Sequence, residues 1–314
     1  MYDFETTQDT EIGENEWGSI YQHKVNCCVS WKFCHQCRNN PEAPCVNCGP
    51  DKIKEFVGLN AREEFCKYLF SPENVNCSAL AHNSRGFDAQ FILDYIHEQG
   101  LKPELMCRGL EIIELKCEGI RLIDSLNFLP MPLSAMSKAF ELSECKGYFP
   151  HFFNRNENWE YEGDLPPIET YGPKHMKVKQ RQEFEKWYNQ EKKDMLETGR
   201  KFNLQKELVH YCHADVAVLV KACIKFREEF MSRTSVDPFV EATTIASACN
   251  VVFRKNYLQP STIAIVPHQG YRKQEKQSIK AIRFMKWYAE KENLATSGQY
   301  IQHAKNNGEF RIDK

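Results

Sequence analysis

The sequence predicts an α/β fold in which helices flank a mixed β-sheet, with a cysteine-rich insertion and a mainly helical C-terminal extension. Short apolar runs of strand character alternate with longer segments whose apolar residues recur at helical spacing. Acidic residues stand at the ends of the predicted strands and on a late, long helix. The composition, 42% hydrophobic and 27% charged, is that of an ordinary globular protein, and no apolar run approaches the length of a membrane span.

The N-terminal elements begin with an extended segment, Met1 to Thr7, which a polar loop separates from a strand at 19–25. We place the cysteine-rich insertion at 26–50. A short helix at 61–70 follows it.

The middle of the chain supplies the rest of the predicted sheet. An apolar strand at 77–82 leads into a helix at 87–99, and three more strands are expected at 105–108, 110–117 and 120–125. Gly109 and Gly119 fall between those three strands, where tight connections are needed. This is the layer arrangement of ribonuclease-H-like domains.

The C-terminal half is predicted to be mainly helical. Helices are expected at 133–142, 180–196, 208–230, 238–255 and 278–292. The character of the sequence changes after Arg233, and we place a domain boundary there.

Fourteen cysteines are many, but six of them lie between residues 27 and 48 and the others are single, mostly among apolar residues. This distribution favours reduced thiols over a disulfide framework. It predicts an intracellular protein, nuclear or cytoplasmic, with no membrane association. The net charge of −2 neither supports nor excludes nucleic acid as a partner.

Three separated segments carry a constellation of acidic residues. Asp3 and Glu5 are two apart on the extended segment and share one face of it. Asp88 opens the helix after the 77–82 strand, and Tyr211 and Asp215 share a helix face. Carboxylates brought together repel one another, so the set is sensible if two Mg²⁺ or Mn²⁺ ions neutralise it. Such a pair of ions suits phosphodiester hydrolysis.

Each carboxylate segment alone is more typical of a solvated surface than of a catalytic site. Taken together and in this order, they resemble the three exonuclease motifs of family B DNA polymerases. The local sequences are similar to the protein-primed branch of that family, which is found in some viruses, linear plasmids and Polinton/Maverick transposons. The motifs are Tyr2-Asp3-Phe4-Glu5-Thr6, His82-Asn83-Ser84-Arg85-Gly86-Phe87-Asp88, Asp124-Ser125-Leu126-Asn127-Phe128-Leu129, Lys146-Gly147-Tyr148-Phe149, Tyr211-Cys212-His213-Ala214-Asp215, and Tyr300 to Glu309.

The resemblance implies a metal-dependent 3′→5′ proofreading exonuclease over residues 1–233, followed by the start of a polymerase region over 234–314. It implies that Asp3, Glu5, Asp88 and Asp215 bind the two metal ions, that Tyr211 orients the attacking water, and that Lys146 assists at the scissile phosphate. It also implies that the frayed DNA 3′ end is held by Thr6, Asn83, Phe87, Ser125 and Leu126. His82 and Phe91 fall at positions that the family uses for single-stranded DNA or the terminal priming protein.

Ordinary structural roles remain open for some of these residues. Phe87, Phe91 and Leu126 fit core packing as well as contact with DNA, and Lys146 fits a surface lysine.

The insertion contains a second metal pattern. Two Cys-x-x-Cys pairs, Cys34 with Cys37 and Cys45 with Cys48, predict a closed tetrahedral site for one structural Zn²⁺. The alternative is a loop of free thiols. Cys27, Cys28 and His35 are potential substitutes for one ligand.

The sequence departs from the family in two respects. Two residues precede Asp3, so we expect a shortened first strand, and neither Asp-x-x-Ser-Leu-Tyr-Pro nor Asp-Thr-Asp, the polymerase motifs, occurs. We therefore expect no polymerase activity from these 314 residues alone. Two other functions stay open: a free-standing RNA exonuclease, and a non-catalytic nucleic-acid-binding remnant of a mobile-element polymerase.

Overall fold

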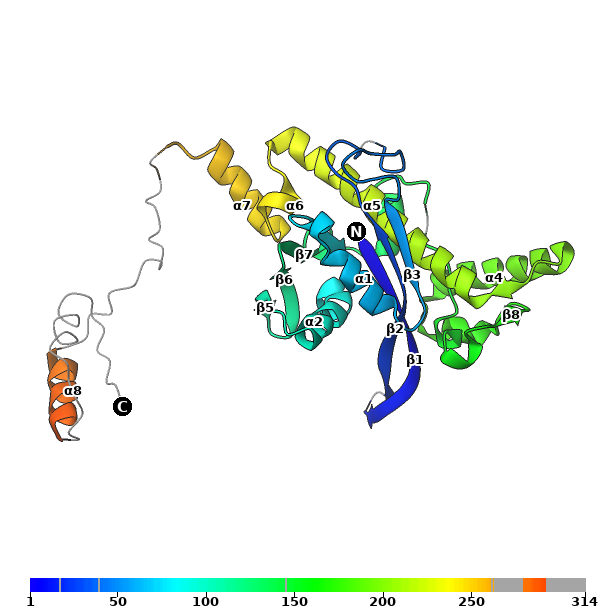
Figure 1. The fold of residues 1–314 in the computed structure, drawn as a ribbon, viewed down its shortest axis with the longest axis horizontal. Helices are drawn as coiled ribbons and strands as arrows, with labels where there is room; N and C mark the ends of the chain where they lie inside the picture. Colours follow the sequence, from blue (N-terminus) through cyan, green and yellow to red (C-terminus); the bar gives the residue numbers. More distant parts are fainter. Residues whose placement is uncertain (17, 39, 145, 261, 263–278, 292–314) are drawn as a thin grey trace. The chain divides into compact units, whose positions relative to one another are not determined.

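The computed structural model describes residues 1–16, 18–38, 40–144, 146–260, 262 and 279–291 (Figure 1). Residues 1–257 form one compact unit and residues 258–314 a second. In the second unit the structure describes α8 (Ile279–Lys291), on which the rings of Phe284 and Trp287 lie 5.9 Å apart. The Tyr300–Glu309 motif lies outside the described residues. No described helix is both long and apolar enough to cross a membrane.

The first unit alternates strands and helices along the chain (Figure 1). Its strands are β1 (Tyr2–Asn15), β2 (Gly18–Trp31), β3 (Ile53–Val57), β4 (Ser78–Ala81), β5 (Glu104–Arg108), β6 (Glu111–Cys117), β7 (Ile120–Asp124), β8 (Glu162–Gly163) and β9 (Phe202–Asn203). Its α-helices are α1 (Ala61–Leu69), α2 (Asp88–Glu98), α3 (Leu133–Ala139), α4 (Val178–Thr198), α5 (Leu204–Thr234), α6 (Pro238–Glu241) and α7 (Ile245–Asn256).

The strands form two main sheets. One is antiparallel in the order β1-β2-β3, and the other has the order β4-β7-β6-β5. The second sheet is mixed, because β4 pairs with β7 in parallel while β7–β6 and β6–β5 are antiparallel. The two sheets meet where β1 lies beside β4. The predicted α/β class with a mixed sheet is confirmed.

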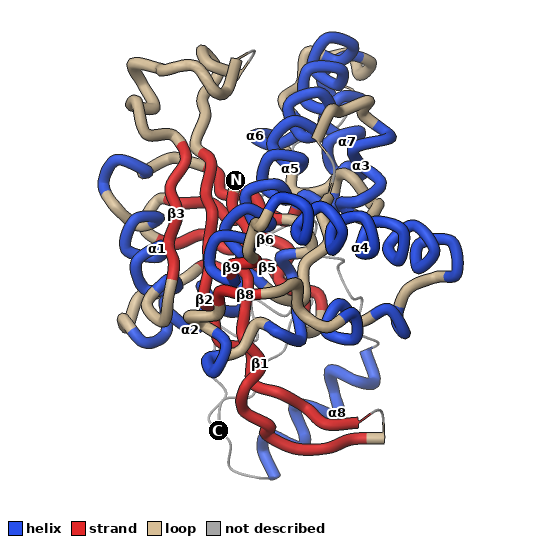
Figure 2. The backbone as a smooth tube through the Cα atoms, turned by 90° about the vertical axis from the view of Figure 1, so that its right-hand side faces the viewer, coloured by secondary structure: helices blue, strands red, loops and turns tan. Residues whose placement is uncertain are grey.

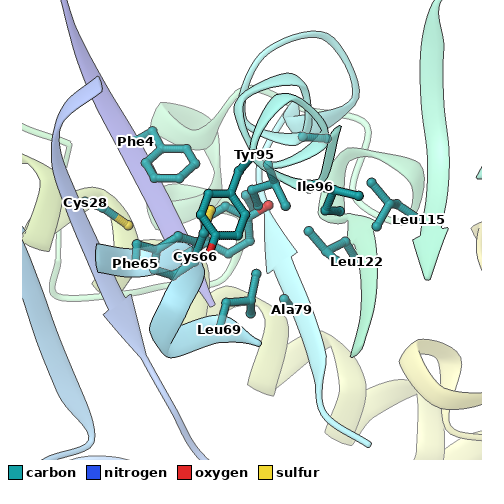
Figure 3. Packing of buried hydrophobic residues seen from close by; sticks show 14 of the residues in the cluster. Phe4, Cys28, Phe65, Cys66, Leu69, Ala79, Tyr95, Ile96, Leu115 and Leu122 are labelled. Atoms are coloured by element: carbon teal, nitrogen blue, oxygen red, sulfur yellow. The ribbon is translucent and has the colours of Figure 1, made fainter. Parts of the chain in front are cut away.

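Helices cover both faces of β1 and β2. Successive side chains of a strand point to opposite faces, so Phe4 and Cys28 pack with Phe65 on the α1–α2 side (Figure 3). Cys27 and Val29 pack with Leu208 of α5 on the other side, as part of a second cluster. Burying a side chain such as Phe65, which is 1% exposed, contributes about 2–3 kcal/mol.

Beyond the sheet, β1 and β2 continue as an exposed two-stranded ribbon (Figure 2). The sequence predicts a polar loop here, and that prediction is wrong. Backbone pairing such as Thr10 with Gln22 and Glu14 with Ser19 builds the ribbon. Because nearly all of its side chains face solvent, no apolar alternation marks it in the sequence.

The cysteine-rich loop is shorter than predicted, since residues 26–31 belong to β2. The loop begins at Lys32 and ends at Lys52, whose carbonyl oxygen accepts a hydrogen bond from the Lys32 N–H at 2.8 Å. It returns into β3, a strand that the sequence does not reveal.

The compact unit continues past the predicted boundary at 233. The segment 238–255, predicted as one helix, is divided into α6 and α7 by a capping box at Thr244. Arg121 of β7 donates to the carbonyl oxygens of Phe239 at 2.5 Å and Ala242 at 2.6 Å, so α6 is bound to the mixed sheet.

Candidate active site

Three carboxylates converge where β1 passes α5. Asp3 and Glu5 stand two residues apart on β1, and Asp215 lies on the facing side of α5. One oxygen from each lies within 4.8 Å of the other two. The strand and helix periodicities that predict shared faces therefore bring these residues together.

Asp88 lies beside this trio and opens α2. It is 2% exposed, and its Oδ1 accepts a hydrogen bond from the Phe4 N–H at 3.1 Å. The bond ties the start of α2 to β1 between Asp3 and Glu5. Burial raises the pKa of Asp88 to about 7.

Buried acidic side chains gathered at one site are unfavourable in their ionised form unless positive charge lies nearby. Burial raises the pKa of Glu5 to about 8; Lys146 opposes this rise, while Asp215 and Asp88 add to it. Burial also raises the pKa of Asp3 well above its usual value, with Asp88 and Glu5 as the next causes. Such carboxylates keep protons at neutral pH unless positive charge is supplied.

Lys146 supplies part of the positive charge at this site. Its Nζ lies 2.5 Å from Asp215 Oδ2 and 5.0 Å from the centre of the Tyr211 ring. Desolvation opposes the charged lysine, but Asp215 and Tyr211 together outweigh it, and the pKa of Lys146 is raised. Lys146 is exposed, as a surface lysine would be, but its ammonium is paired with the buried Asp215 carboxylate.

The donor set fits a hard divalent cation. Asp215 Oδ1 is buried and has no hydrogen-bond partner among the described residues. A buried oxygen without a partner is costly, and the carboxylate that carries it belongs to the cluster with Asp3 and Glu5. Oxygen ligands in this arrangement suit Mg²⁺ or Mn²⁺.

The segment after Lys146 covers Tyr211. The Tyr211 ring stacks on Phe149, with centroids 5.3 Å apart, and meets His151 edge-on at 5.3 Å. His151 Nδ1 lies 3.7 Å from Glu5 Oε2, and its side chain is 47% exposed. Partial desolvation, with Lys146 as the next cause, lowers the pKa of His151. The sequence analysis missed His151, because no pattern links it to a carboxylate 146 residues earlier.

A row of aromatic rings runs from Phe4 of β1 to Phe87, the residue before Asp88. Phe87 meets Phe91 edge-on at 5.1 Å, and Phe91 meets the core ring of Phe4 at 5.9 Å. Phe87 and Phe91 are half-buried, so they pack against the core and also present surface. Thr6, next to Glu5, binds His23 Nδ1 through Oγ1 at 2.9 Å.

Asp124 joins the loops that follow β4 and β7. It is 1% exposed, and its carboxylate accepts hydrogen bonds from the backbone N–H groups of Asn83, Arg85 and Leu126 at 2.8–3.1 Å. Asn83 is exposed and has a left-handed φ of 61°. Asp124 therefore has a structural role, which its position in the sequence motif did not predict.

Ser125 follows Asp124 and lies inside the protein. It is fully buried, and its hydroxyl donates to the carbonyl oxygen of Ala81 at 3.1 Å. A hydroxyl has one hydrogen, so the 2.9 Å contact with His82 needs His82 Nδ1 as the donor. Ser125 thus orients His82, which is half-buried beside it.

The four paired cysteines also converge. Their Sγ atoms lie within 4.8 Å of one another, with Cys34–Cys45 at 3.6 Å, Cys37–Cys48 at 3.8 Å and Cys34–Cys37 at 4.0 Å. A tetrahedron with zinc–sulfur bonds of about 2.3 Å has sulfur–sulfur edges of about 3.8 Å. The donor set therefore fits one Zn²⁺.

The alternative zinc ligands are not supported by their positions. Cys27 and Cys28 are fully buried on opposite faces of β2, and His35 is exposed at the edge of the loop.

Comparison with known proteins identifies relatives of this chain. The family described as DNA polymerase type B, organellar and viral, matches residues 70–285. A probable DNA polymerase of Ascobolus immersus is 27% identical over 209 residues, which is 63% of this chain and 17% of that protein. A probable DNA polymerase of Neurospora intermedia is 25% identical over 189 residues, or 56% of this chain and 19% of that protein. The chain thus spans less than a quarter of the length of these relatives.

Among solved structures, a Phi29 DNA polymerase complexed with primer-template DNA aligns with 81% of this chain and 34% of its own. The sequence identity is 14% and the TM-score is 0.44.

Proposed function

Because this chain belongs to the type B DNA polymerases of organelles and viruses, we propose that residues 1–233 are the metal-dependent 3′→5′ exonuclease part of such a polymerase, with a ribonuclease-H-like fold. The observation that carries the proposal is the convergence of Asp3, Glu5 and Asp215 within 4.8 Å, beside Asp88. The resemblance to protein-primed members is carried by the motifs of the sequence.

Asp3, Glu5, Asp88 and Asp215 would hold two Mg²⁺ or Mn²⁺ ions. Such ions, when bound, help to ionise water and stabilise the leaving oxygen of a phosphodiester. The chain's own residues position the reactants. Burial raises the pKa of Tyr211 further above its usual value, so its phenol stays protonated and can donate a hydrogen bond to an attacking water.

Lys146 would keep its charge throughout, because its pKa is raised. It neutralises Asp215 and offers a positive charge to a phosphate entering beside Tyr211. Phe87 and Phe91 would support the bases of a frayed strand, since stacking on aromatic side chains tolerates any sequence. Asn83 and Leu126 would contact the strand from the two loops that Asp124 joins.

The four cysteines would bind one structural Zn²⁺. Their loop contacts α5, with Arg38 3.9 Å from Glu228 and Glu42 3.4 Å from Lys221. The same helix carries Asp215, so a folded zinc loop would brace the helix that completes the acidic site.

The partners we propose are the 3′ end of DNA and, as in protein-primed replication, a terminal priming protein. Residues 234–314 would begin the polymerase region, and polymerisation is not expected from them alone. The compartment stays a prediction from cysteine usage.

The test is degradation of 5′-labelled single-stranded and 3′-recessed DNA with Mg²⁺ or Mn²⁺. We expect stepwise shortening from the 3′ end that Asp3→Ala and Asp215→Ala both abolish. Asp94→Ala, at an exposed acid on α2, is the matched control and should leave the rate unchanged.

Two outcomes would favour the other functions. Faster shortening of RNA than of DNA of the same sequence would indicate an RNA exonuclease. DNA binding without metal-dependent shortening, from a folded and zinc-loaded sample, would indicate a non-catalytic remnant.

A further inference from the structure

Thr6 is poorly available for direct contact with a DNA strand. Its side chain is 9% exposed, and its hydroxyl is bonded to His23 Nδ1 at 2.9 Å. Its carbonyl oxygen accepts a hydrogen bond from Asn154 Nδ2 at 3.0 Å. The hydroxyl and the carbonyl oxygen of Thr6 thus each have a partner within the protein.

His23 occupies the surface above Thr6. It lies on β2 at the root of the exposed ribbon, and its side chain is exposed. Its ring meets Phe87 edge-on, with centroids 5.5 Å apart and an interplanar angle of 86°. No group among the described residues bonds its second ring nitrogen, Nε2.

We propose that His23 contacts the 3′-terminal nucleotide of the single strand directly, and that Thr6 acts as its positioning residue. The inference rests on the exonuclease function proposed above. Phe87 directly precedes Asp88 in the chain, so the ring that His23 contacts is carried by the neighbour of one of the four carboxylates. A nucleotide whose phosphate lies at Asp3 and Glu5 would carry its base toward His23 and Phe87.

The chemistry of the imidazole suits this contact. A flat ring can stack on any base, and Nε2 can bond a base edge or a phosphate oxygen. The Thr6 hydroxyl rotates, so it can donate to Nδ1 or accept from it. When it donates, the proton resides on Nε2, which then donates to an acceptor on DNA. Partial desolvation lowers the pKa of His23, which favours the neutral ring at pH 7.

The experiment measures binding without cleavage. A single-stranded oligonucleotide with 2-aminopurine as its 3′-terminal base is titrated with protein in EDTA, and both anisotropy and 2-aminopurine fluorescence are followed. We expect His23→Ala to weaken binding about tenfold, as for loss of one stacked base, and to reduce the fluorescence change on binding. His97→Ala, at an exposed histidine on α2, should match the wild type.

A double-mutant cycle separates the roles of His23 and Thr6. Thr6→Val should weaken binding in the wild type but add nothing to His23→Ala, because it acts through the ring. His23→Phe keeps a ring against Phe87 and should retain most of the fluorescence change. If His23→Ala lowers the thermal midpoint of unfolding, the comparison of His23→Phe with the wild type tests the inference instead.

The inference is overturned if neither His23 variant changes affinity or fluorescence, or if Thr6→Val costs the same with and without His23. Those results would leave the exonuclease proposal untouched. Failure of the wild type to shorten DNA with metal would instead overturn the proposed function itself.

Discussion

Replacing Glu5 by glutamine should stabilise the metal-free protein at pH 8. Glu5 is 9% exposed and adjoins Asp3 and Asp215, so ionising it adds negative charge to a buried acidic site. Its pKa of about 8 lies far above the usual value of 4.5. Glutamine keeps the shape and removes the charge.

The sign follows from proton binding. Between pH 4.5 and about pH 8 the folded protein keeps a proton on Glu5 that the unfolded chain has lost. The free energy of unfolding therefore falls as pH rises through this window. A displacement of this size corresponds to at most about 5 kcal/mol. Lys146 and proton sharing among the carboxylates reduce it, and we expect an advantage of about 2 kcal/mol for Glu5→Gln at pH 8.

The assay is thermal and urea unfolding in EDTA at pH 5 and pH 8. The variant should melt about 4–8 °C above the wild type at pH 8 and close to it at pH 5. Added Mg²⁺ or Mn²⁺ should stabilise the wild type more than the variant. Glu104→Gln, at an exposed glutamate on β5, is the matched control. An advantage that is absent at pH 8, or equal at both pH values, would refute the reasoning.

Three further predictions concern other contacts. Lys146→Met should lower kcat for DNA shortening about 100-fold with little change in KM, because it removes a positive charge beside the scissile phosphate. Single-turnover rates test this prediction, and an unchanged rate would contradict it. Cys45→Ser should lower the amount of bound zinc, measured by elemental analysis, from one ion per chain toward none. Cys107→Ser, at an exposed thiol, should leave the zinc content unchanged. Equal zinc content in the two variants would exclude the Cys₄ site. Arg121→Leu should lower the free energy of unfolding by about 3 kcal/mol, because it removes the donor to two carbonyl oxygens and leaves the Glu114 carboxylate with Lys116 as its remaining cation. Arg108→Leu, at an exposed arginine, should change it by less than about 0.5 kcal/mol, and equal losses would contradict this.

The carboxylate site could be predicted because its residues carry their own periodicity. Asp3 and Glu5 share a strand face and Tyr211 and Asp215 share a helix face, and the structure keeps both arrangements. The Cys-x-x-Cys spacing likewise predicts its cluster without any knowledge of the surrounding fold.

Residues that act through pairing across the fold could not be predicted in this way. His23 reaches Thr6 because β2 folds back on β1, and the ribbon that brings them together has no apolar alternation. Asp124 joins two loops 40 residues apart through backbone N–H groups, which leave no mark on side-chain patterns. The limits of the cysteine loop were misplaced because Cys27 and Cys28 serve as small core residues of β2.

The most direct test of the exonuclease proposal is the identity of the first product released in a single turnover. The substrate is single-stranded DNA whose 3′-terminal nucleotide carries one label and whose 5′ end carries another, mixed with excess protein and Mn²⁺. We expect the 3′ label to appear first, as a nucleoside 5′-monophosphate, and Asp215→Ala to release none. Early release of the 5′ label, or of 3′-labelled oligonucleotides instead of mononucleotides, would contradict it.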